Sequence, residues 1–277
     1  MILFDGKRHA EHIADLLRDE IKKKRLDLAL AVMQVGEELV ITSFIKQKQK
    51  FAEIIGLRVH IFSLPNKISQ VELESEVRRI GADPSFQGLI IQLPLPSNIN
   101  IEPVLSSIPL NKDVDLLSSK AFERFEQGYS TILPPVVGAV AEILSSQGIP
   151  LKGEAVVLVG KGRLVGKPLA IWLEKEGALV RQCEADSPDL KKIIPHADIV
   201  ISGVGKSGLI KGEMVRHGAV IIDAGTSEAK GEIKGDVDQE SVAQKASLLA
   251  PVPGGVGPLT VAMLFKNLVT LATMNQV

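Results

Sequence analysis

The sequence contains a single cysteine, Cys183, among its 277 residues. One cysteine excludes a disulfide framework and any metal site built from several cysteine ligands. The five histidines are scattered without the spacing typical of metal ligands: His9, His12, His60, His196 and His217. The sequence therefore predicts no metal site.

Neither sign of charge is in excess, because 32 basic residues face 33 acidic ones and leave a formal net charge of -1. Such a chain has no basic field for nucleic acid and no acidic tail. Residues 1–7 lack the apolar segment of a signal peptide, and no apolar run approaches the roughly 18 residues that span a bilayer. We therefore expect a cytoplasmic protein with neither a nucleic-acid nor a membrane partner.

The composition is that of a globular protein, with 45% hydrophobic and 23% charged residues, and the length fits two domains. In the first half, helices are expected at 8–24, 38–55 and 69–81, and strands at 26–35, 58–62 and 88–92. This βαβαβ order predicts a parallel sheet covered by helices. Residues 97–133 are expected to be irregular, and a helix near 136–147 to connect the two halves.

The second half repeats the alternation of strands and helices. Strands are expected at 155–159, 179–183, 199–202 and 219–223, and helices at 165–176, 188–195 and 259–273. The expected fold is α/β with two domains, and the last helix is expected to return to the first domain. Residues 1–135 with 259–277 would form a three-layer α/β catalytic domain, and residues 136–258 a Rossmann-like dinucleotide-binding domain.

A glycine-rich turn lies between the strand at 155–159 and the helix that follows it. Gly160, Gly162 and Gly166 would let the backbone N–H groups approach a pyrophosphate at the helix N-terminus. Their spacing is one residue longer than the usual G-x-G-x-x-G, but strand, glycines, helix and second strand come in the right order. The turn predicts dinucleotide binding, and the alternative is an ordinary turn between strand and helix.

Charged residues near this turn favour different dinucleotides. Glu184 and Asp186 follow the second strand, where an acid holds an adenosine ribose hydroxyl and repels a 2′-phosphate, and they favour NAD. Lys161 and Arg163 favour NADP. These residues leave the choice open.

One lysine shares the apolar face of the helix expected at 38–55. That face is formed by Ile41, Phe44, Lys48, Phe51 and Ile55. Lys48 either extends along the apolar surface with its ammonium in water, or is partly buried, with a pKa lowered by desolvation that makes the amine usable for proton transfer.

Gln92 is the only polar residue of the strand at 88–92 and stands at its carboxyl end. Open α/β sheets bind their ligands at that end of the strands. Gln92 is therefore either a ligand-site residue or an amide that hydrogen-bonds the backbone at a strand end.

Motifs along nearly the whole chain resemble those of the bifunctional methylenetetrahydrofolate dehydrogenase/cyclohydrolase family. They are Asp5-Gly6-Lys7, Val35-Gly36, Lys48 and Lys50 ahead of Gly56, the segments 92–96, 112–115 and 165–168, Gly235-Asp236-Val237 and, most specifically, the segment 251–260. The resemblance implies oxidation of 5,10-methylenetetrahydrofolate with a nicotinamide cofactor, usually NADP, and hydrolysis of the methenyl product to 10-formyltetrahydrofolate. It also implies a homodimer.

The resemblance assigns roles to particular residues. Lys48 is similar to the family's catalytic lysine, Gln92 to the glutamine that hydrogen-bonds it, and Asp115 to the carboxylate that holds the pterin. Phe44 and Pro258 would also contact the tetrahydrofolate substrate. Gly160, Lys161, Gly162, Gly166 and Thr226 would contact the cofactor.

Several positions depart from the family pattern. Phe44 replaces a tyrosine and Ile41 a serine, while Leu116 stands where a glycine usually follows the aspartate, and Pro135-Val136 takes the place of the usual Thr-Pro. The remaining departures lie at the adenosine end of the cofactor site: Lys161 and Gly162 replace arginine and serine, and Glu184-Ala185 replaces histidine-serine.

Three alternatives to the bifunctional enzyme remain open. The chain could be an NAD-linked dehydrogenase with weak or absent hydrolysis, or a degenerate paralogue that binds folate or nucleotide without catalysis. Retention of Lys48, Gln92 and Asp115 together counts against the paralogue. A dehydrogenase of the shikimate type would share the fold, but would not explain the segment 251–260.

Overall fold

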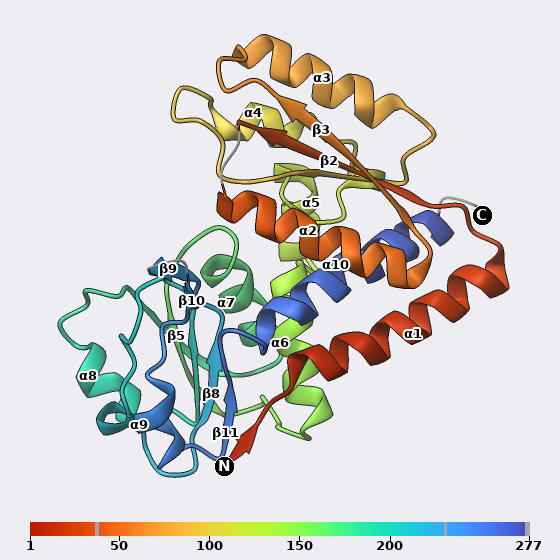
Figure 1. Ribbon diagram of the computed structural model, residues 1–277. Coiled ribbons are helices and arrows are strands. Elements are labelled where there is room, and N and C mark those ends of the chain that lie inside the picture. Colours follow the sequence, from red (N-terminus) through yellow and green to blue (C-terminus); the bar gives the residue numbers. More distant parts are fainter. Residues whose placement is uncertain (37–38, 230–231, 275–277) are drawn as a thin grey trace. The chain divides into compact units, whose positions relative to one another are not determined.

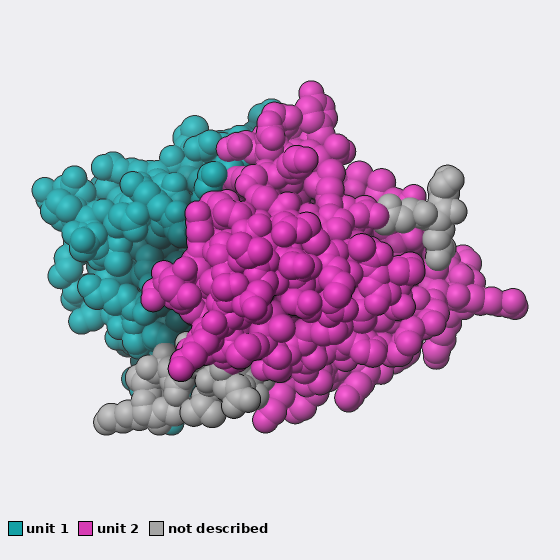
Figure 2. Space-filling model, turned by 90° about the horizontal axis from the view of Figure 1, so that it is seen from above, with its two compact units in different colours: residues 1–10, 136–260 teal, residues 11–135, 261–277 magenta. Residues whose placement is uncertain are grey.

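The computed structural model describes residues 1–36, 39–229 and 232–274, and for residues 39–44 and 228–229 it describes the backbone alone. The chain forms two compact units, coloured separately in Figure 2. Unit 1 contains residues 1–10 and 136–260, and unit 2 contains residues 11–135 and 261–277. The domain boundaries predicted from the sequence put residues 1–10 in the same domain as residues 11–135. They group with unit 1 because strand β1 (Ile2–Leu3) pairs with β11 (Leu248–Ala250).

Unit 2 is built on a three-stranded parallel sheet in the order β3-β2-β4. Its strands and major helices are α1 (Gly6–Lys24, from residue 11 onward), β2 (Ala29–Val35), α2 (Leu39–Ile55), β3 (Arg58–Leu64), α3 (Gln70–Ala82) and β4 (Gly88–Ile91). Helices α3 and α2 lie on opposite faces of this sheet (Figure 1). The expected parallel sheet with helices on both faces is confirmed.

Short helices occupy part of the region that was expected to be irregular. They are α4 (Ile101–Ser106), the 3₁₀ turn η1 (Leu110–Lys112) and α5 (Ser119–Glu126). The side chain of Asn100 caps α4 and that of Ser118 caps α5, each by accepting a backbone N–H of the first turn. Val104, Leu105 and Ile108 then pack into the unit 2 core. The prediction missed these helices because six to eight residues are too few to display an amphipathic period.

The last helix, α10 (Val256–Met274), returns to unit 2 as expected. Phe265 stacks on Phe51 with ring centroids 5.3 Å apart. The Asn267 amide donates to the carbonyl oxygens of Val114 at 2.9 Å and Leu133 at 2.8 Å. By length and composition α10 could cross a membrane, so the expectation that no apolar run is long enough was wrong. Its burial and these contacts identify it as a core helix of the fold.

Unit 1 is built on a six-stranded parallel sheet in the order β1-β11-β8-β7-β5-β6. Besides β1 and β11 it contains α6 (Pro135–Ser146), β5 (Ala155–Val159), α7 (Gly166–Lys175), β6 (Leu179–Cys183), α8 (Leu190–Ile193), β7 (Ile199–Ser202), β8 (Val220–Asp223) and α9 (Gln239–Ala243). The 3₁₀ turns are η2 (Ile194–His196) and η3 (Gly212–Met214), and β9 (Ser227–Ala229) pairs antiparallel with β10 (Glu232–Lys234).

Burial along the strands of unit 1 follows their position in the sheet. The four residues of β7 and the four of β8 are all buried, as expected for central strands of a parallel sheet with both faces covered. Strand β6 is at an edge, and there exposed and half-buried side chains alternate over the first four residues before the buried Cys183. The sequence predicted these strands, but it missed β1, β11 and the β9–β10 hairpin, whose strands are only two or three residues long.

Candidate functional site

Each sheet reverses its strand order at one point. In unit 2 the chain goes from β2 outward to β3 and then returns to the other side of β2 as β4. In unit 1 it goes from β5 to β6 and returns as β7. Ligands of open parallel sheets bind beside the carboxyl ends of the strands where the order reverses. Gln92 follows β4, and the glycine-rich turn follows β5, so both candidate sites occupy these positions.

Lys48 and Gln92 meet at the reversal point of unit 2. The Lys48 Nζ atom donates a hydrogen bond of 2.7 Å to Gln92 Oε1. Gln92 Nε2 donates in turn to the carbonyl oxygen of Leu93 at 3.1 Å, which fixes the amide with its oxygen toward the amine. The Gln92 backbone N–H donates to Met33 O of β2, which anchors the glutamine to the sheet. The expected proximity of the two side chains is confirmed.

Lys48 is held in this position by the face of α2 on which it lies. Ile45, Phe51, Ala52 and Ile55 of that helix are buried, whereas Lys48 is half-buried and Lys46 is exposed. Burial lowers the pKa of Lys48, and the charge of Asp115 partly opposes that shift. Lys48 is therefore not an ordinary surface lysine. The side chains of Ile41 and Phe44 lie outside the described residues, so the predicted contact of Phe44 with substrate remains a prediction.

Asp115 lies close enough to Lys48 for the two charges to act on each other. Burial raises the pKa of Asp115 to about 6, although Lys48 pulls it down and Asp113 adds to the rise. Like Lys48 and Gln92, Asp115 keeps part of its surface in contact with solvent. The three polar groups are therefore close together and accessible to a small molecule.

The loop that carries Asp115 is held by the carboxylate of Asp113. Asp113 is 1% exposed and accepts the backbone N–H groups of Leu117 at 3.1 Å and Ser118 at 2.8 Å. Leu116 has φ +54°, a conformation that disfavours side chains other than glycine. It is also 2% exposed, so packing of the side chain compensates for the conformation. This is the position at which the family usually has glycine.

In unit 1 the turn after β5 is shaped by glycines. Gly160 has φ +112°, and a Cβ atom there would lie 2.9 Å from Val204 Cγ1 and 3.0 Å from the Gly203 carbonyl oxygen, beyond the end of β7. Gln182 Nε2 donates to Gly160 O at 2.8 Å. A Cβ atom at Gly166 would overlap the Gly160 carbonyl, whereas Gly162 has open space around it. The turn is therefore tightly packed at Gly160 and Gly166 and open at Gly162.

This shape fits a dinucleotide. The open side of Gly162 and the N-terminus of α7 leave room for a pyrophosphate to approach the backbone. The side chains of Lys161 and Glu184 are exposed, and their charges both act on the pKa of Cys183, which burial raises. Opposite charges therefore flank the end of β6, where the adenosine ribose is expected. Asp186 is also exposed.

The two remaining predicted contact residues both lie in unit 1. Thr226 is exposed, and its carbonyl oxygen would lie 3.0 Å from a Cβ atom at Gly205. Pro258 is half-buried in the first turn of α10. Their roles with cofactor and substrate stay predictions.

Gly166→Ala should destabilise unit 1, because a methyl group at this position would overlap backbone atoms of residues 160 and 161 and neither can move as a side chain would. We expect thermal unfolding to show a loss of about 2 kcal/mol or more. Gly162→Ala is the matched control, since its methyl group would meet open space and should change stability by less than about 0.5 kcal/mol. Equal midpoints for the two variants would contradict the close packing of helix on turn.

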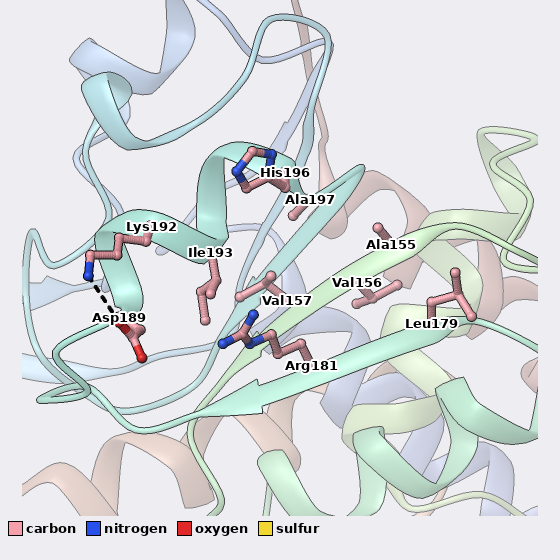
Figure 3. A pocket seen from close by; sticks show the side chains of 10 residues that line it. All are labelled: Ala155, Val156, Val157, Leu179, Arg181, Asp189, Lys192, Ile193, His196 and Ala197. Atoms are coloured by element: carbon pink, nitrogen blue, oxygen red, sulfur yellow. Dashed lines mark ion pairs between the residues drawn. The ribbon is translucent and has the colours of Figure 1, made fainter.

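A separate hollow of about 440 Å³ opens beside α8 in unit 1. Figure 3 shows its lining, including Arg181, Ile193, His196 and the ion pair of Lys192 with Asp189 at 3.5 Å. Its wall includes Ala155, the first residue of β5, whereas the glycine-rich turn follows the last. At about 3.3 Å per residue the first and last residues of this strand are roughly 13 Å apart. The hollow contains none of the predicted site residues.

Together, the two reversal points and the groups gathered at them define a dinucleotide-dependent enzyme of the two-domain α/β class. Comparison with known proteins identifies the family. Residues 4–115 match the catalytic domain of tetrahydrofolate dehydrogenase/cyclohydrolase, and residues 134–276 match its NAD(P)-binding domain. The chain belongs to this family. Its activities are therefore the dehydrogenase and cyclohydrolase of folate one-carbon metabolism, with NAD or NADP as cofactor.

Individual relatives match over the full length. The bifunctional protein FolD of Nautilia profundicola is 39% identical over 276 residues, covering 98% of this chain and 97% of that protein. The FolD methylenetetrahydrofolate dehydrogenase/cyclohydrolase structure from Campylobacter jejuni has a TM-score of 0.95 at 34% identity and covers 100% of both chains. The Trypanosoma brucei FolD structure, complexed with NADP and an inhibitor, has a TM-score of 0.94 at 31% identity and covers 99% of this chain and 98% of that one.

Three buried carboxylates organise the loops around these sites, and the sequence predicted no role for any of them, although Asp113 and Asp236 lie within motifs of the family resemblance. Asp113 supports the loop of Asp115, and Asp223 and Asp236 tie together loops of unit 1. The signal available in the sequence was an aspartate beside or two residues from glycine, in Asp223-Ala224-Gly225 and Gly235-Asp236, but such pairs are common in surface turns.

Proposed function

We propose that the chain oxidises 5,10-methylenetetrahydrofolate with NADP and hydrolyses the methenyl product to 10-formyltetrahydrofolate, with Lys48, Gln92 and Asp115 as the working residues of one site. The observation that carries this proposal is the 2.7 Å hydrogen bond between Lys48 and Gln92 at the carboxyl end of β4. The lowered pKa of Lys48 and the raised pKa of Asp115 support it, because perturbed pKa values concentrate at functional sites.

Lys48 has the properties needed to move a proton during hydrolysis. Burial already lowers the pKa of its amine, and a cationic methenyl substrate nearby would lower it further. The neutral amine would accept a proton from the water molecule that attacks the methenyl carbon. Gln92 would act as the positioning residue, since its oxygen accepts one N–H of Lys48 and so restricts the direction of the amine lone pair.

Asp115 is proposed to hold the pterin. A carboxylate is a natural partner for the N–H-rich edge of that ring because it accepts hydrogen bonds with both oxygens. A pKa of about 6 leaves Asp115 mostly ionised at neutral pH. The pterin N–H groups would replace the hydration that burial has partly removed from this carboxylate.

The cofactor is proposed to bind at the turn formed by residues 160–166, with Thr226 nearby. A dinucleotide bound there would supply the hydride acceptor for the dehydrogenase reaction. The chain itself supplies the backbone N–H groups at the start of α7 and the charge of Lys161 for the 2′-phosphate of NADP. The alternative is an NAD-linked enzyme with weak hydrolysis, which the exposed acids Glu184 and Asp186 favour.

Lys161→Ala tests the NADP preference. If Lys161 contacts the 2′-phosphate, kcat/KM with NADP should fall by about tenfold or more, equivalent to about 1.4 kcal/mol, while kcat/KM with NAD changes little. Glu184→Ser should shift the ratio toward NADP, because it removes a charge that repels the phosphate. The measurement is the steady-state rate with each cofactor for both variants. Equal losses with NAD and NADP would place the phosphate elsewhere.

We also propose that the protein is a cytoplasmic homodimer, as the family resemblance implies. Edge strand β6 supports self-association because it carries an exposed leucine, Leu179, at 66% exposure. Light scattering after size-exclusion chromatography should give twice the mass of one chain. A mass equal to one chain at micromolar concentration would contradict the dimer.

A further inference from the structure

Two fully buried carboxylates stand among the loops at the carboxyl end of the unit 1 sheet. Asp223 ends β8, Asp236 follows β10, and both are 0% exposed. Neither takes part in the chemistry proposed above. A buried carboxylate is unfavourable unless its oxygens accept hydrogen bonds, so the groups that donate to these two residues indicate what the pair does.

Asp236 gathers donors from the loop that follows β7. Its Oδ2 atom accepts the Ser202 hydroxyl at 2.7 Å and the Val204 backbone N–H at 2.8 Å. Its Oδ1 atom accepts the Lys206 backbone N–H at 2.7 Å. Three donors from five consecutive residues therefore converge on one carboxylate, which fixes the course of the loop at 202–206.

Asp223 holds Asp236 in place. Its Oδ1 atom accepts the backbone N–H groups of Gly225 and Asp236, each at 3.1 Å, and its Oδ2 atom accepts that of Val237 at 2.9 Å. Burial raises the pKa of Asp223 to about 6, with these hydrogen bonds opposing the rise and Asp236 adding to it. A Cβ atom at Gly225 would overlap the Asp236 carboxylate, and one at Gly235 would overlap that of Asp223. The backbone is therefore wrapped closely around both groups.

The loop fixed by Asp236 forms one wall of the glycine-rich turn. Gly160 faces Val204 and Gly203, and a Cβ atom at Gly203 would overlap Val165 Cγ1. Beyond it, Gly205 approaches the carbonyl oxygen of Thr226. Any shift of residues 203–206 would therefore change the space beside Gly160, at the point where the strand order of this sheet reverses.

We propose that Asp236, held by Asp223, is a positioning residue for the dinucleotide: it fixes the loop at 203–206 against the glycine-rich turn so that the cofactor meets a preformed wall. This inference rests on the proposed cofactor site. Position 236 requires a carboxylate because all three groups around it donate hydrogen bonds, and a carboxylate accepts with both oxygens. An asparagine would turn an NH₂ group toward at least one of these donors.

The test is Asp236→Asn, with the dehydrogenase and cyclohydrolase reactions measured separately. We expect the Kd and KM of the dinucleotide to rise at least about tenfold for NADP and NAD alike, because the wall is common to both. Methenyl hydrolysis without dinucleotide should stay within about twofold of wild type, since Lys48, Gln92 and Asp115 belong to unit 2. A merely structural role would lower both activities together, and that result, or an unchanged dinucleotide Kd, would overturn the inference.

Two further variants keep the test decisive. Asp198→Asn is the matched control: Asp198 accepts the Ala155 backbone N–H at 2.7 Å and pairs with Arg216 at the opposite end of the same sheet. Its removal should leave the dinucleotide Kd unchanged. If Asp236→Asn does not fold, Ser202→Ala removes one donor and leaves the carboxylate; a threefold or larger rise in Kd supports the inference, and no rise overturns it.

Lys161→Ala separates this inference from the cofactor site on which it rests. If that variant loses NADP affinity while Asp236→Asn does not change the Kd of either dinucleotide, only the positioning role fails. If neither variant alters binding of either dinucleotide, the cofactor site itself is wrong.

Discussion

Lys48→Met should reduce methenyl hydrolysis by about 100-fold or more while the protein stays folded. Methionine keeps much of the length and apolar stem of lysine but has no amine to accept a proton, and positioned acid–base groups typically contribute 10²–10⁴-fold. The stem carries the packing on the face of α2. Removing a partly buried amine should therefore leave the thermal midpoint unchanged or slightly raised.

Lys46→Met is the matched control because Lys46 lies on the same helix with its side chain exposed. It should hydrolyse the methenyl substrate at the wild-type rate. The measurement is the decay of methenyl absorbance with and without enzyme, together with thermal unfolding of all three proteins. Wild-type hydrolysis by Lys48→Met, or loss of its fold, would show that the amine is structural.

Asp115→Asn should weaken folate binding and make the protein more stable at neutral pH. Losing a charged acceptor is typically worth about 1.5–3 kcal/mol, so kcat/KM for methylenetetrahydrofolate should fall by at least about tenfold. The effect on stability has the opposite sign, because the native state holds a carboxylate that burial disfavours.

The effect of Asp115 on folding stability depends on pH, and its raised pKa fixes the direction of that dependence. The pKa of Asp115 is about 6 in the folded protein and 3.8 as its ordinary value, so between these pH values the folded state holds a proton that the unfolded state has lost. Its contribution is fully present below about pH 4 and is lost as the pH rises through 6, by up to about 3 kcal/mol. Asp115→Asn should remove this part of the slope.

Denaturant unfolding at pH 4.5 and 7.5 measures the effect. The stability that wild type loses between these pH values should be smaller in Asp115→Asn, and at pH 7.5 the variant should be the more stable protein. Asp19→Asn, on an exposed position of α1, should change neither quantity. An unaltered slope in Asp115→Asn would mean that Asp115 titrates normally in the folded state.

Much of the fold could be predicted because, in a long helix or strand, the spacing of the apolar residues shows which face is buried. The observed bounds of the strand at 155–159 equal the predicted ones. Both ends of α2, α3 and α6 lie within one residue of their predicted positions. The pairing of Lys48 with Gln92 was implied by the family resemblance, whereas the residues alone left the environment of each side chain open; the structure contains the hydrogen bond.

Other features depended on contacts between distant residues. Strand β1 belongs to the sheet of unit 1 because its backbone pairs with β11, almost 250 residues later. A strand of two residues has no sequence pattern from which this pairing could be predicted. Leu116 adopts φ +54° because Asp113 organises the loop and the core accepts its side chain.

The sequence by itself determined the two α/β units, the positions of the glycine-rich turn and the lysine-bearing helix, and the resemblance that names the chemistry, because each is written in residues close together along the chain. Only the tertiary structure decided which buried carboxylates support those elements. Asp113, Asp223 and Asp236 accept hydrogen bonds from backbone groups that become neighbours when the sheets form, and the energy of a buried charge depends on donors that no local pattern specifies.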